Sequence, residues 1–177
     1  GPGYAFGTGF EYLASRVEPD DIVLTMEGDN TSNIELVPTM IERMEREKYD
    51  VVLASPYAHG GTLENTKLVR VLLSHFANGF VKIALGIRGI HTLSSFFRVY
   101  SGEIIRRLQR RYGNRILERT GFESMVELLK KLIILGASIS EVPMKLDASR
   151  RAGSSKMRIL RTISGYLSLS FDAKRWD

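Results

Sequence analysis

The chain contains no cysteine, which excludes a disulfide framework, a thiolate metal site and a cysteine nucleophile. No clean apolar run reaches the roughly 18 residues that a membrane-spanning helix needs. The first residues, Gly1 to Tyr4, show neither the charged region nor the apolar run of a signal peptide. These absences predict a protein of a reducing compartment, and we expect a cytoplasmic location.

The 177 residues suffice for one domain with a hydrophobic core, and the 44% apolar content argues against disorder. The net charge is +5 and the isoelectric point is near 9.6. Such a balance favours a polyanionic partner, which could be a nucleic acid, a nucleotide phosphate or an anionic membrane surface.

Short apolar runs alternate with segments of helical periodicity along the chain. We predict strands over residues 22–26, 49–55, 91–100 and 137–146, and helices up to residue 16 and over residues 34–46, 64–85, 101–112, 121–135 and 157–171. Pro143, inside the last strand, predicts an edge strand or a bend. The alternation predicts an α/β layer fold with a largely parallel sheet.

The predicted strand 22–26 ends in two carboxylates, Glu27 and Asp29, before a polar turn and a helix. Ligands of open α/β sheets bind beyond the carboxyl ends of the strands. Two like charges at such a place repel unless a positive group lies between them, and hard divalent cations take carboxylate oxygens. The alternative is an acidic, solvated turn that caps the next helix, and these residues alone leave both interpretations open.

Four further segments each have a functional and a structural interpretation. The glycine-rich start suits close approach to a phosphate or a flexible helix entry. The helix 64–85 carries a polar stripe that is either solvated or directed at a site: Lys67, Arg70, Ser74 and Asn78. The basic loop 150–156 suits oxyanions or is a solvated linker. The helix 157–171 is amphipathic and basic at its start, so it packs on its own domain or lies on a membrane.

Taken in order, these segments resemble the family 2 GT-A glycosyltransferases, close to the dolichyl-phosphate mannose synthases and other polyprenyl-phosphate sugar transferases. The family's glycine-rich helix entry is matched by Gly1-Pro2-Gly3-Tyr4-Ala5 with Gly9, and its D-x-D motif by Met26-Glu27-Gly28-Asp29. The G-S-R-Y…G-G loop and the helix after it are matched by Ala54-Ser55-Pro56-Tyr57, Gly60-Gly61, Arg70, Ser74 and Asn78. The T-S-G-F-R and E-V-P…R-x-x-G-x-S-K motifs are matched by Ser94-Ser95-Phe96-Phe97-Arg98, Glu141-Val142-Pro143, Arg150, Gly153, Ser155 and Lys156.

The chain departs from the family pattern at several positions. Glu27 replaces the first aspartate of D-x-D, Pro56 replaces a phosphate-binding arginine, Phe96 replaces a glycine, and Thr92 replaces an aspartate. Family members begin with a βαβ unit that holds the nucleotide base, and this chain starts after the place of that unit. We therefore expect either a fragment of a longer protein, truncated at its N-terminus, or a base held by something absent from the chain.

The resemblance implies a three-layer GT-A fold and an inverting transfer of a hexose from GDP-mannose or UDP-glucose to a polyprenyl or dolichyl phosphate. It also implies a Mg²⁺ or Mn²⁺ cofactor held by Asp29, with Glu27 assisting directly or through water. Asp29, Arg70 and Arg98 are the implied catalytic residues, although Arg98 could instead pair with a carboxylate. The implied substrate and phosphate contacts are Gly3, Thr31, Tyr57, Arg70, Asn78, Arg150, Ser155 and Lys156.

The same resemblance divides the chain into a glycosyltransferase domain at residues 1–155 and an amphipathic helix at residues 156–177, resting on the cytoplasmic face of a membrane. Two other classes compete with this interpretation. A non-catalytic glycosyltransferase-like subunit is suggested by the lack of the N-terminal βαβ unit and by Pro56 in place of the phosphate-binding arginine. A basic nucleic-acid-binding module is motivated by the isoelectric point, but the basic residues lack the aromatic platforms of single-strand binders, and we expect no nucleic-acid partner.

Overall fold

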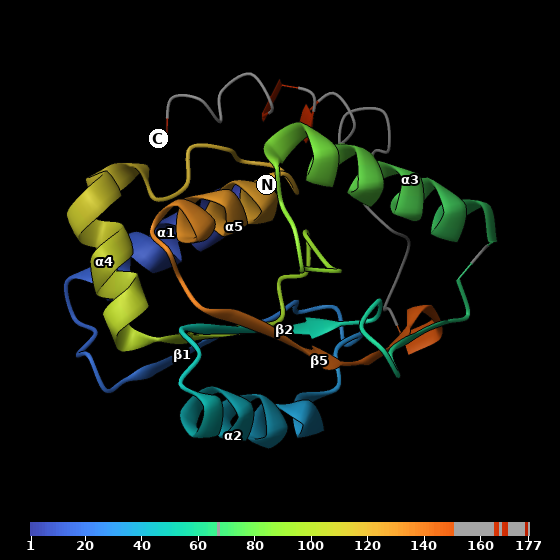
Figure 1. Ribbon diagram of the computed structural model, residues 1–177, viewed down its shortest axis with the longest axis horizontal. Helices are drawn as coiled ribbons and strands as arrows, with labels where there is room; N and C mark the ends of the chain where they lie inside the picture. The colour runs from blue at the N-terminus through green and yellow to red at the C-terminus, as the bar shows by residue number, and fades with distance from the viewer. Residues whose placement is uncertain (67, 151–164, 167, 170–175, 177) are drawn as a thin grey trace.

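The computed structural model describes residues 1–66, 68–150, 165–166, 168–169 and 176. Figure 1 shows a central sheet with α2 on one side and α1, α4 and α5 on the other, which confirms the three-layer α/β prediction. The helices are α1 (Pro2–Ala14), α2 (Val37–Glu47), α3 (Leu68–Leu85), α4 (Gly102–Tyr112) and α5 (Ser124–Ile134), with 3-10 turns η1 (Ile34–Leu36), η2 (Gly113–Arg115) and η3 (Ala148–Arg150). The strands are β1 (Ile22–Thr25), β2 (Val51–Ser55), β3 (Thr62–Glu64), β4 (Arg98–Ser101), β5 (Ile139–Pro143) and β6 (Lys145–Asp147).

The main sheet has the strand order β1-β4-β2-β5. Strand β4 is antiparallel to both β1 and β2, whereas β2 and β5 are parallel. Three of the four strands therefore run in one direction and β4 runs against them. The prediction of a mostly parallel sheet holds for strand direction, but β4 makes two of the three pairings antiparallel.

The central strand β2 is buried on both faces, as its unbroken apolar run predicts. Val51 and Leu53 contribute to a core shared with α1, α4 and α5, while Val52 and Ala54 contribute to a second core with Met40 of α2. This division follows the two-residue side-chain period of a strand. The sheet is thus held between two apolar layers, and its strand ends are fixed relative to one another.

Several boundaries differ from the predictions. The helix predicted over residues 64–85 begins only at Leu68, because Glu64 belongs to β3. The predicted strand 137–146 is two strands, because the chain bends after Pro143 and the Met144 N–H donates to the Ser55 carbonyl (3.0 Å). The second part, β6, pairs with the unpredicted β3 in a separate two-stranded sheet. Residues 91–97 form a loop, so β4 begins only at Arg98. Pro143 ends an edge strand, as predicted.

Local signals placed two helices correctly. The Ser101 side chain caps α4 by accepting from the Ile104 N–H (3.3 Å). Gly136 follows α5 with φ of 70°, the left-handed conformation that glycine adopts most easily. None of the helices in the described part of the chain is long and apolar enough to cross a membrane.

The predicted helix 157–171 lies outside the described residues except for residues 165–166 and 168–169, which are helical. Leu169 and Trp176 are buried in the core shared with α1, α4 and α5. These described residues pack on the domain, and a boundary between residues 155 and 156 stays a prediction.

Candidate functional site

One edge of the sheet gathers the chain segments that the sequence marks as functional. Strands β1, β2 and β5 share a direction, so Thr25, Ser55 and Pro143 end at the same edge. Because β4 runs the opposite way, its first residue, Arg98, pairs with Thr25 and brings the loop 91–97 to that edge. Ligand sites of open α/β sheets lie at such an edge.

Glu27 ties two of these loops together. One carboxylate oxygen accepts from the Ser32 hydroxyl (2.8 Å) and the other accepts from the Phe96 backbone N–H (3.2 Å). Phe96 and Ser32 are buried, while Glu27 itself is half-buried. Both oxygens of Glu27 are therefore engaged in holding the loop after β1 against the loop before β4.

Asp29 is organised differently, in a turn of its own. Its Oδ1 accepts from the backbone N–H of Thr31 (3.2 Å) and from the Thr31 hydroxyl (2.6 Å). Asn30, between them, has φ of 62°, which asparagine tolerates better than most residues. The helical cap is supplied by Asn33, whose side chain accepts from the Glu35 N–H (3.2 Å). Asp29 thus does not cap the helix, and the interpretation of the acidic pair as a helix cap loses its main support.

Ser55, the last residue of β2, stabilises the loop that follows the strand. This wholly buried hydroxyl accepts from the N–H groups of Tyr57 (3.3 Å) and Ala58 (3.1 Å). Gly61 closes the loop, because a Cβ there would lie 2.6 Å from the Ser55 carbonyl oxygen. The Tyr57 ring meets the ring of His75 on α3 edge-on, at 5.0 Å between centroids. Tyr57 is therefore fixed between the strand end and α3.

The loop before β4 is anchored by Glu141 of β5. Its carboxylate accepts from the backbone N–H of His91 (2.8 Å) and of Thr92 (2.8 Å), and contacts His91 Nδ1 at 2.7 Å. The Glu141 side chain is only 8% exposed, whereas the His91 side chain is 59% exposed. The glutamate of the E-V-P motif therefore acts by fixing a loop of the candidate site.

Arg98 lies beneath that loop and is completely buried. Its guanidinium donates to the carbonyls of Ser95 (2.7 Å), Leu93 (2.8 Å) and Met125 (3.1 Å). The implied catalytic role of Arg98 stays a prediction, and these bonds favour the structural alternative, with backbone carbonyls in place of the expected carboxylate partner. Arg98 is better described as a positioning residue that joins loop 91–97 to α5.

Tyr166 reaches this edge from the C-terminal part of the chain, although no sequence motif singles it out. Burial raises the pKa of its hydroxyl, and a hydrogen bond with the Ser94 side chain acts in the opposite direction. The carboxylate of Glu123 and the hydroxyl of Tyr57 lie close enough to raise that pKa further. The one sequence feature that bears on Tyr166 is the amphipathic pattern of residues 157–171, and this pattern does not show which residues Tyr166 contacts.

Gly3 has a packing role, and the phosphate contact implied for it stays a prediction. Its N–H donates to the Thr120 carbonyl (3.0 Å), and a Cβ at this position would lie 2.3 Å from the Arg119 carbonyl oxygen. The N-terminal turn of α1 is thus pressed against residues 119–124. Its glycine permits that approach, and its N–H group is already satisfied.

The predicted cations are only partly described. Arg70 lies on α3, but its side chain is outside the described part, as are Ser155 and Lys156. Arg150 is exposed at the end of η3 and lines a hollow of about 350 Å³ between η1, β3 and β6, together with Asn33, Leu36, Glu64, Pro143, Met144, Lys145 and Asp147. Hydrogen bonds from Asn65 and Ser149 lower the pKa of Asp147 there. Thr31 is buried beside Asp29, and Asn78 is half-buried on α3.

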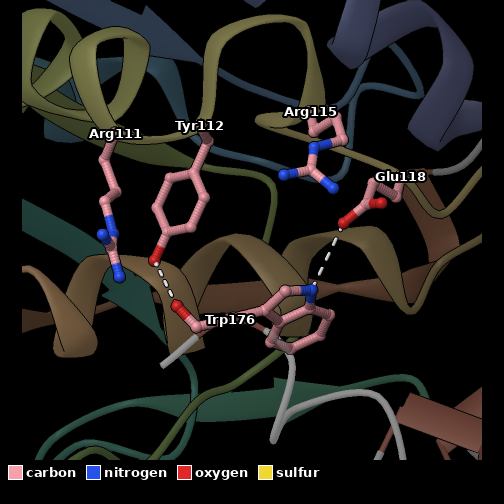
Figure 2. A pocket seen from close by; sticks show the side chains of 5 residues that line it. All are labelled: Arg111, Tyr112, Arg115, Glu118 and Trp176. Atoms are coloured by element: carbon pink, nitrogen blue, oxygen red, sulfur yellow. Dashed lines mark hydrogen bonds between the residues drawn. The ribbon is translucent and has the colours of Figure 1, made fainter.

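A second hollow, of about 210 Å³, lies at the far end of α4 and is shown in Figure 2. It is closed by Trp176, whose indole donates to Glu118 (3.3 Å) and whose carbonyl accepts from the Tyr112 hydroxyl (3.5 Å). The buried Lys131 ammonium lies 5.1 Å from both the Tyr112 and Trp176 rings. These contacts secure the end of the chain to α4 and α5, away from the strand ends.

The sequence and the fold both have known counterparts. A family model described as glycosyl transferase family 2 matches residues 1–109. The chain is 27% identical over 157 residues to a polyprenol monophosphomannose synthase of Mycolicibacterium smegmatis and 28% identical over 158 residues to a dolichol-phosphate mannosyltransferase of Pyrococcus furiosus. Both alignments cover 89% of this chain, but they cover 56% and 42% of those relatives, so the chain spans about half of their length.

The fold resembles the crystal structure of a glucosyl-3-phosphoglycerate synthase from Mycobacterium tuberculosis in complex with phosphoglyceric acid. The TM-score is 0.55, with 15% identity, 94% of this chain covered and 52% of that chain covered. This likeness supports the GT-A fold alone. With the family model matching most of the chain and the acidic strand end in the expected place, the chain belongs to glycosyl transferase family 2.

Proposed function

We propose that this protein transfers a hexose from a nucleoside-diphosphate sugar to a polyprenyl or dolichyl phosphate, with inversion at the sugar. The observation that carries the proposal is the hydrogen bond by which Glu27, in the acidic loop after β1 that also carries Asp29, meets loop 91–97 at the carboxyl edge of the sheet, in a chain of this family. The printed names of the two relatives support the lipid phosphate acceptor. For the donor we propose GDP-mannose or UDP-glucose.

In the proposed reaction an acceptor phosphate oxygen attacks the anomeric carbon, and the bond to the nucleoside diphosphate breaks. The bonding electrons leave with the diphosphate, which accumulates negative charge. The attacking oxygen is already ionised at neutral pH, so the reaction has little need of a general base. What it needs is positive charge around two phosphorylated substrates and exact placement of both.

The residues after β1 fit a hard divalent cation such as Mg²⁺ or Mn²⁺. Asp29 uses its Oδ1 to hold Thr31, and carboxylate and hydroxyl oxygens are suitable ligands. No three carboxylates or histidines converge among the described residues, so a metal here would rest on few protein ligands and on substrate oxygens, as Mg²⁺ commonly does. When bound, the cation would neutralise charge on the leaving diphosphate.

Each described residue has a defined part in this proposal. Asp29 holds the cation and Thr31 fixes the Asp29 carboxylate. Glu27, Glu141 and Arg98 position the loops around it. Arg150 meets a phosphate from its exposed position at the end of η3, and Asn78 is a further substrate contact. The remaining substrate contacts are assigned to Arg70, Ser155 and Lys156, whose side chains lie outside the described part of the chain.

We also propose that the protein works at the cytoplasmic surface of a membrane, where its lipid acceptor resides, and that residues 156–177 form a helix that assists this attachment. A non-catalytic role remains the rival function, favoured by the engagement of both Glu27 oxygens in loop contacts.

A transfer assay decides between the two functions. The protein is incubated with Mn²⁺, a radiolabelled nucleotide sugar and a short polyprenyl phosphate in detergent, and the lipid product is extracted. We expect labelled lipid from one of the two donors, with a loss of at least about 100-fold in Asp29→Asn because one transition-state charge contact disappears. NMR of the product should show the inverted anomer. Product of equal yield from Asp29→Asn contradicts the assigned site, and no product with either donor supports the non-catalytic role.

A further inference from the structure

Helix α3 carries three exposed apolar side chains on one face. Phe76, Phe80 and Ile83 are 77%, 49% and 85% exposed. At about 100° per residue these three positions fall within an arc of about 60° and span about 10 Å along the helix. Single exposed apolar residues are common, but three aligned ones on one helix face need an explanation.

The other face of the same helix is already used for folding. Val81 and Leu85 are 1% and 4% exposed and belong to the core shared with α1, α4 and α5. They lie roughly opposite the exposed arc. Figure 1 places α3 at the outer edge of the molecule, on the side of the sheet away from α2. The exposed face is therefore a second apolar surface that folding does not require.

The charge around this face has one sign. Between Glu64 and Glu103 the sequence has no acidic residue, while it has five basic ones: Lys67, Arg70, Lys82, Arg88 and Arg98. Arg98 is buried, but Arg88 is exposed and Lys82 is half-buried immediately beside Ile83. A helix with aromatic and aliphatic residues on one face and basic residues at its flanks is the pattern of interfacial helices on anionic lipid.

We infer that the face of Phe76, Phe80 and Ile83, flanked by Lys82 and Arg88, docks on an anionic bilayer surface. A second copy of the chain fits less well, because a symmetric contact would bring the same basic residues together with no carboxylate between Glu64 and Glu103 to balance them. The inference concerns binding to lipid and does not depend on the chemistry at Asp29. It adds a second contact to the one proposed for residues 156–177.

The first test is co-sedimentation of the purified protein with vesicles of phosphatidylcholine containing about 30% phosphatidylglycerol, without metal, donor or polyprenyl phosphate. We expect binding that falls by at least about tenfold in the triple variant Phe76→Ser, Phe80→Ser, Ile83→Ser. The matched control is Tyr4→Ser with Tyr12→Ser, which removes two aromatic residues that are 70% and 61% exposed on α1 and should leave binding unchanged.

The charge contribution is tested with Lys82→Glu and Arg88→Glu. Each basic residue near an anionic surface is worth about 1 kcal/mol, so binding should fall by about thirtyfold or more, and raising the salt concentration should weaken the wild type. The control is Arg46→Glu with Arg110→Glu, two exposed side chains on α2 and α4. Equal losses in the control and in the α3 variant would show a non-specific charge effect and overturn the inference.

A labelling experiment keeps the inference testable even where the serine variant fails to fold. Because the chain has no cysteine, Ile83→Cys and Tyr4→Cys each give one attachment site for an environment-sensitive fluorophore. We expect a blue shift on adding anionic vesicles for position 83 and none for position 4. Absence of a shift at position 83, or a triple serine variant that converts a dimer to a monomer in sedimentation, overturns the bilayer assignment.

Discussion

Replacing each of the two carboxylates after β1 should have different consequences, because Glu27 joins two loops while Asp29 is the proposed cation ligand. In Glu27→Gln the amide can keep both contacts, since its oxygen can accept from the Phe96 N–H and its NH₂ can donate to the Ser32 oxygen. We expect a change in the free energy of unfolding of less than about 1 kcal/mol.

Glu27→Ala removes both contacts and leaves the Phe96 N–H and the Ser32 hydroxyl without partners, on residues that are 5% exposed. An unsatisfied buried polar group costs about 1–3 kcal/mol, and water admitted beside the half-buried Glu27 site reduces that cost. We therefore expect a loss of about 2 kcal/mol in urea unfolding. Asp29→Asn should leave stability within about 1 kcal/mol because an amide oxygen can still accept from Thr31.

Mn²⁺ affinity, measured by electron paramagnetic resonance in the presence of GDP or UDP, separates the two roles. Asp29→Asn should weaken Mn²⁺ binding at least about tenfold, whereas Glu27→Gln should change it by less than about threefold. A loss in Glu27→Gln as large as that in Asp29→Asn would refute the division of labour and make Glu27 a ligand.

Three further predictions concern the frame of the site. Arg98→Met removes the donors to three buried carbonyls, so it should lower the free energy of unfolding in urea by about 3–5 kcal/mol. Arg98→Lys cannot reach all three carbonyls, so its stability should lie between that of Arg98→Met and the wild type, and a loss below about 1 kcal/mol in Arg98→Met contradicts the positioning role. Gly61→Ala should destabilise the protein by about 2 kcal/mol or more, because its Cβ would approach the Ser55 carbonyl oxygen at 2.6 Å. Gly28→Ala is the neutral control, because no atom lies within 4 Å of the added Cβ. Equal melting temperatures for the two variants would show that the loop after β2 can move to accommodate the methyl group. Burial raises the pKa of Tyr100 above its usual value of 10.0, although the charge of Arg98 opposes the shift. The neutral Tyr100 hydroxyl therefore favours the folded state fully below pH 10.0, and this contribution is lost as the pH rises from 10.0 through the folded-state pKa. Tyr100→Phe should gain stability relative to the wild type above pH 10.0, and parallel pH–stability curves would refute this.

The sequence predicted most of the architecture because its strongest signals are local. The continuous apolar run of β2, the cap at Ser101 and the stop at Gly136 each act through neighbours in the chain, and each was placed correctly. The pairing of β3 with β6 was missed because three-residue strands leave no periodicity to detect. The reversed direction of β4 was not predicted, because direction depends on the whole connection between β2 and β4, which includes β3 and α3.

The candidate site was predictable in position but not in the division of roles. The acidic strand end and the E-V-P segment indicated which residues meet at the carboxyl edge. Their hydrogen bonds are long-range, however: Glu27 reaches Phe96, Glu141 reaches His91, and Arg98 reaches Met125. A one-dimensional pattern shows that a charged residue is present, but only the fold shows whether its charge meets a substrate or a backbone group.

The most direct test of the central claim is a calorimetric titration of the protein with GDP and with UDP, each with and without Mn²⁺. The account predicts that one nucleotide binds only when Mn²⁺ is present, and that Asp29→Asn abolishes this metal-dependent binding while Glu27→Gln retains it. Binding that is independent of Mn²⁺, or unchanged in Asp29→Asn, would contradict a metal–diphosphate site at the end of β1.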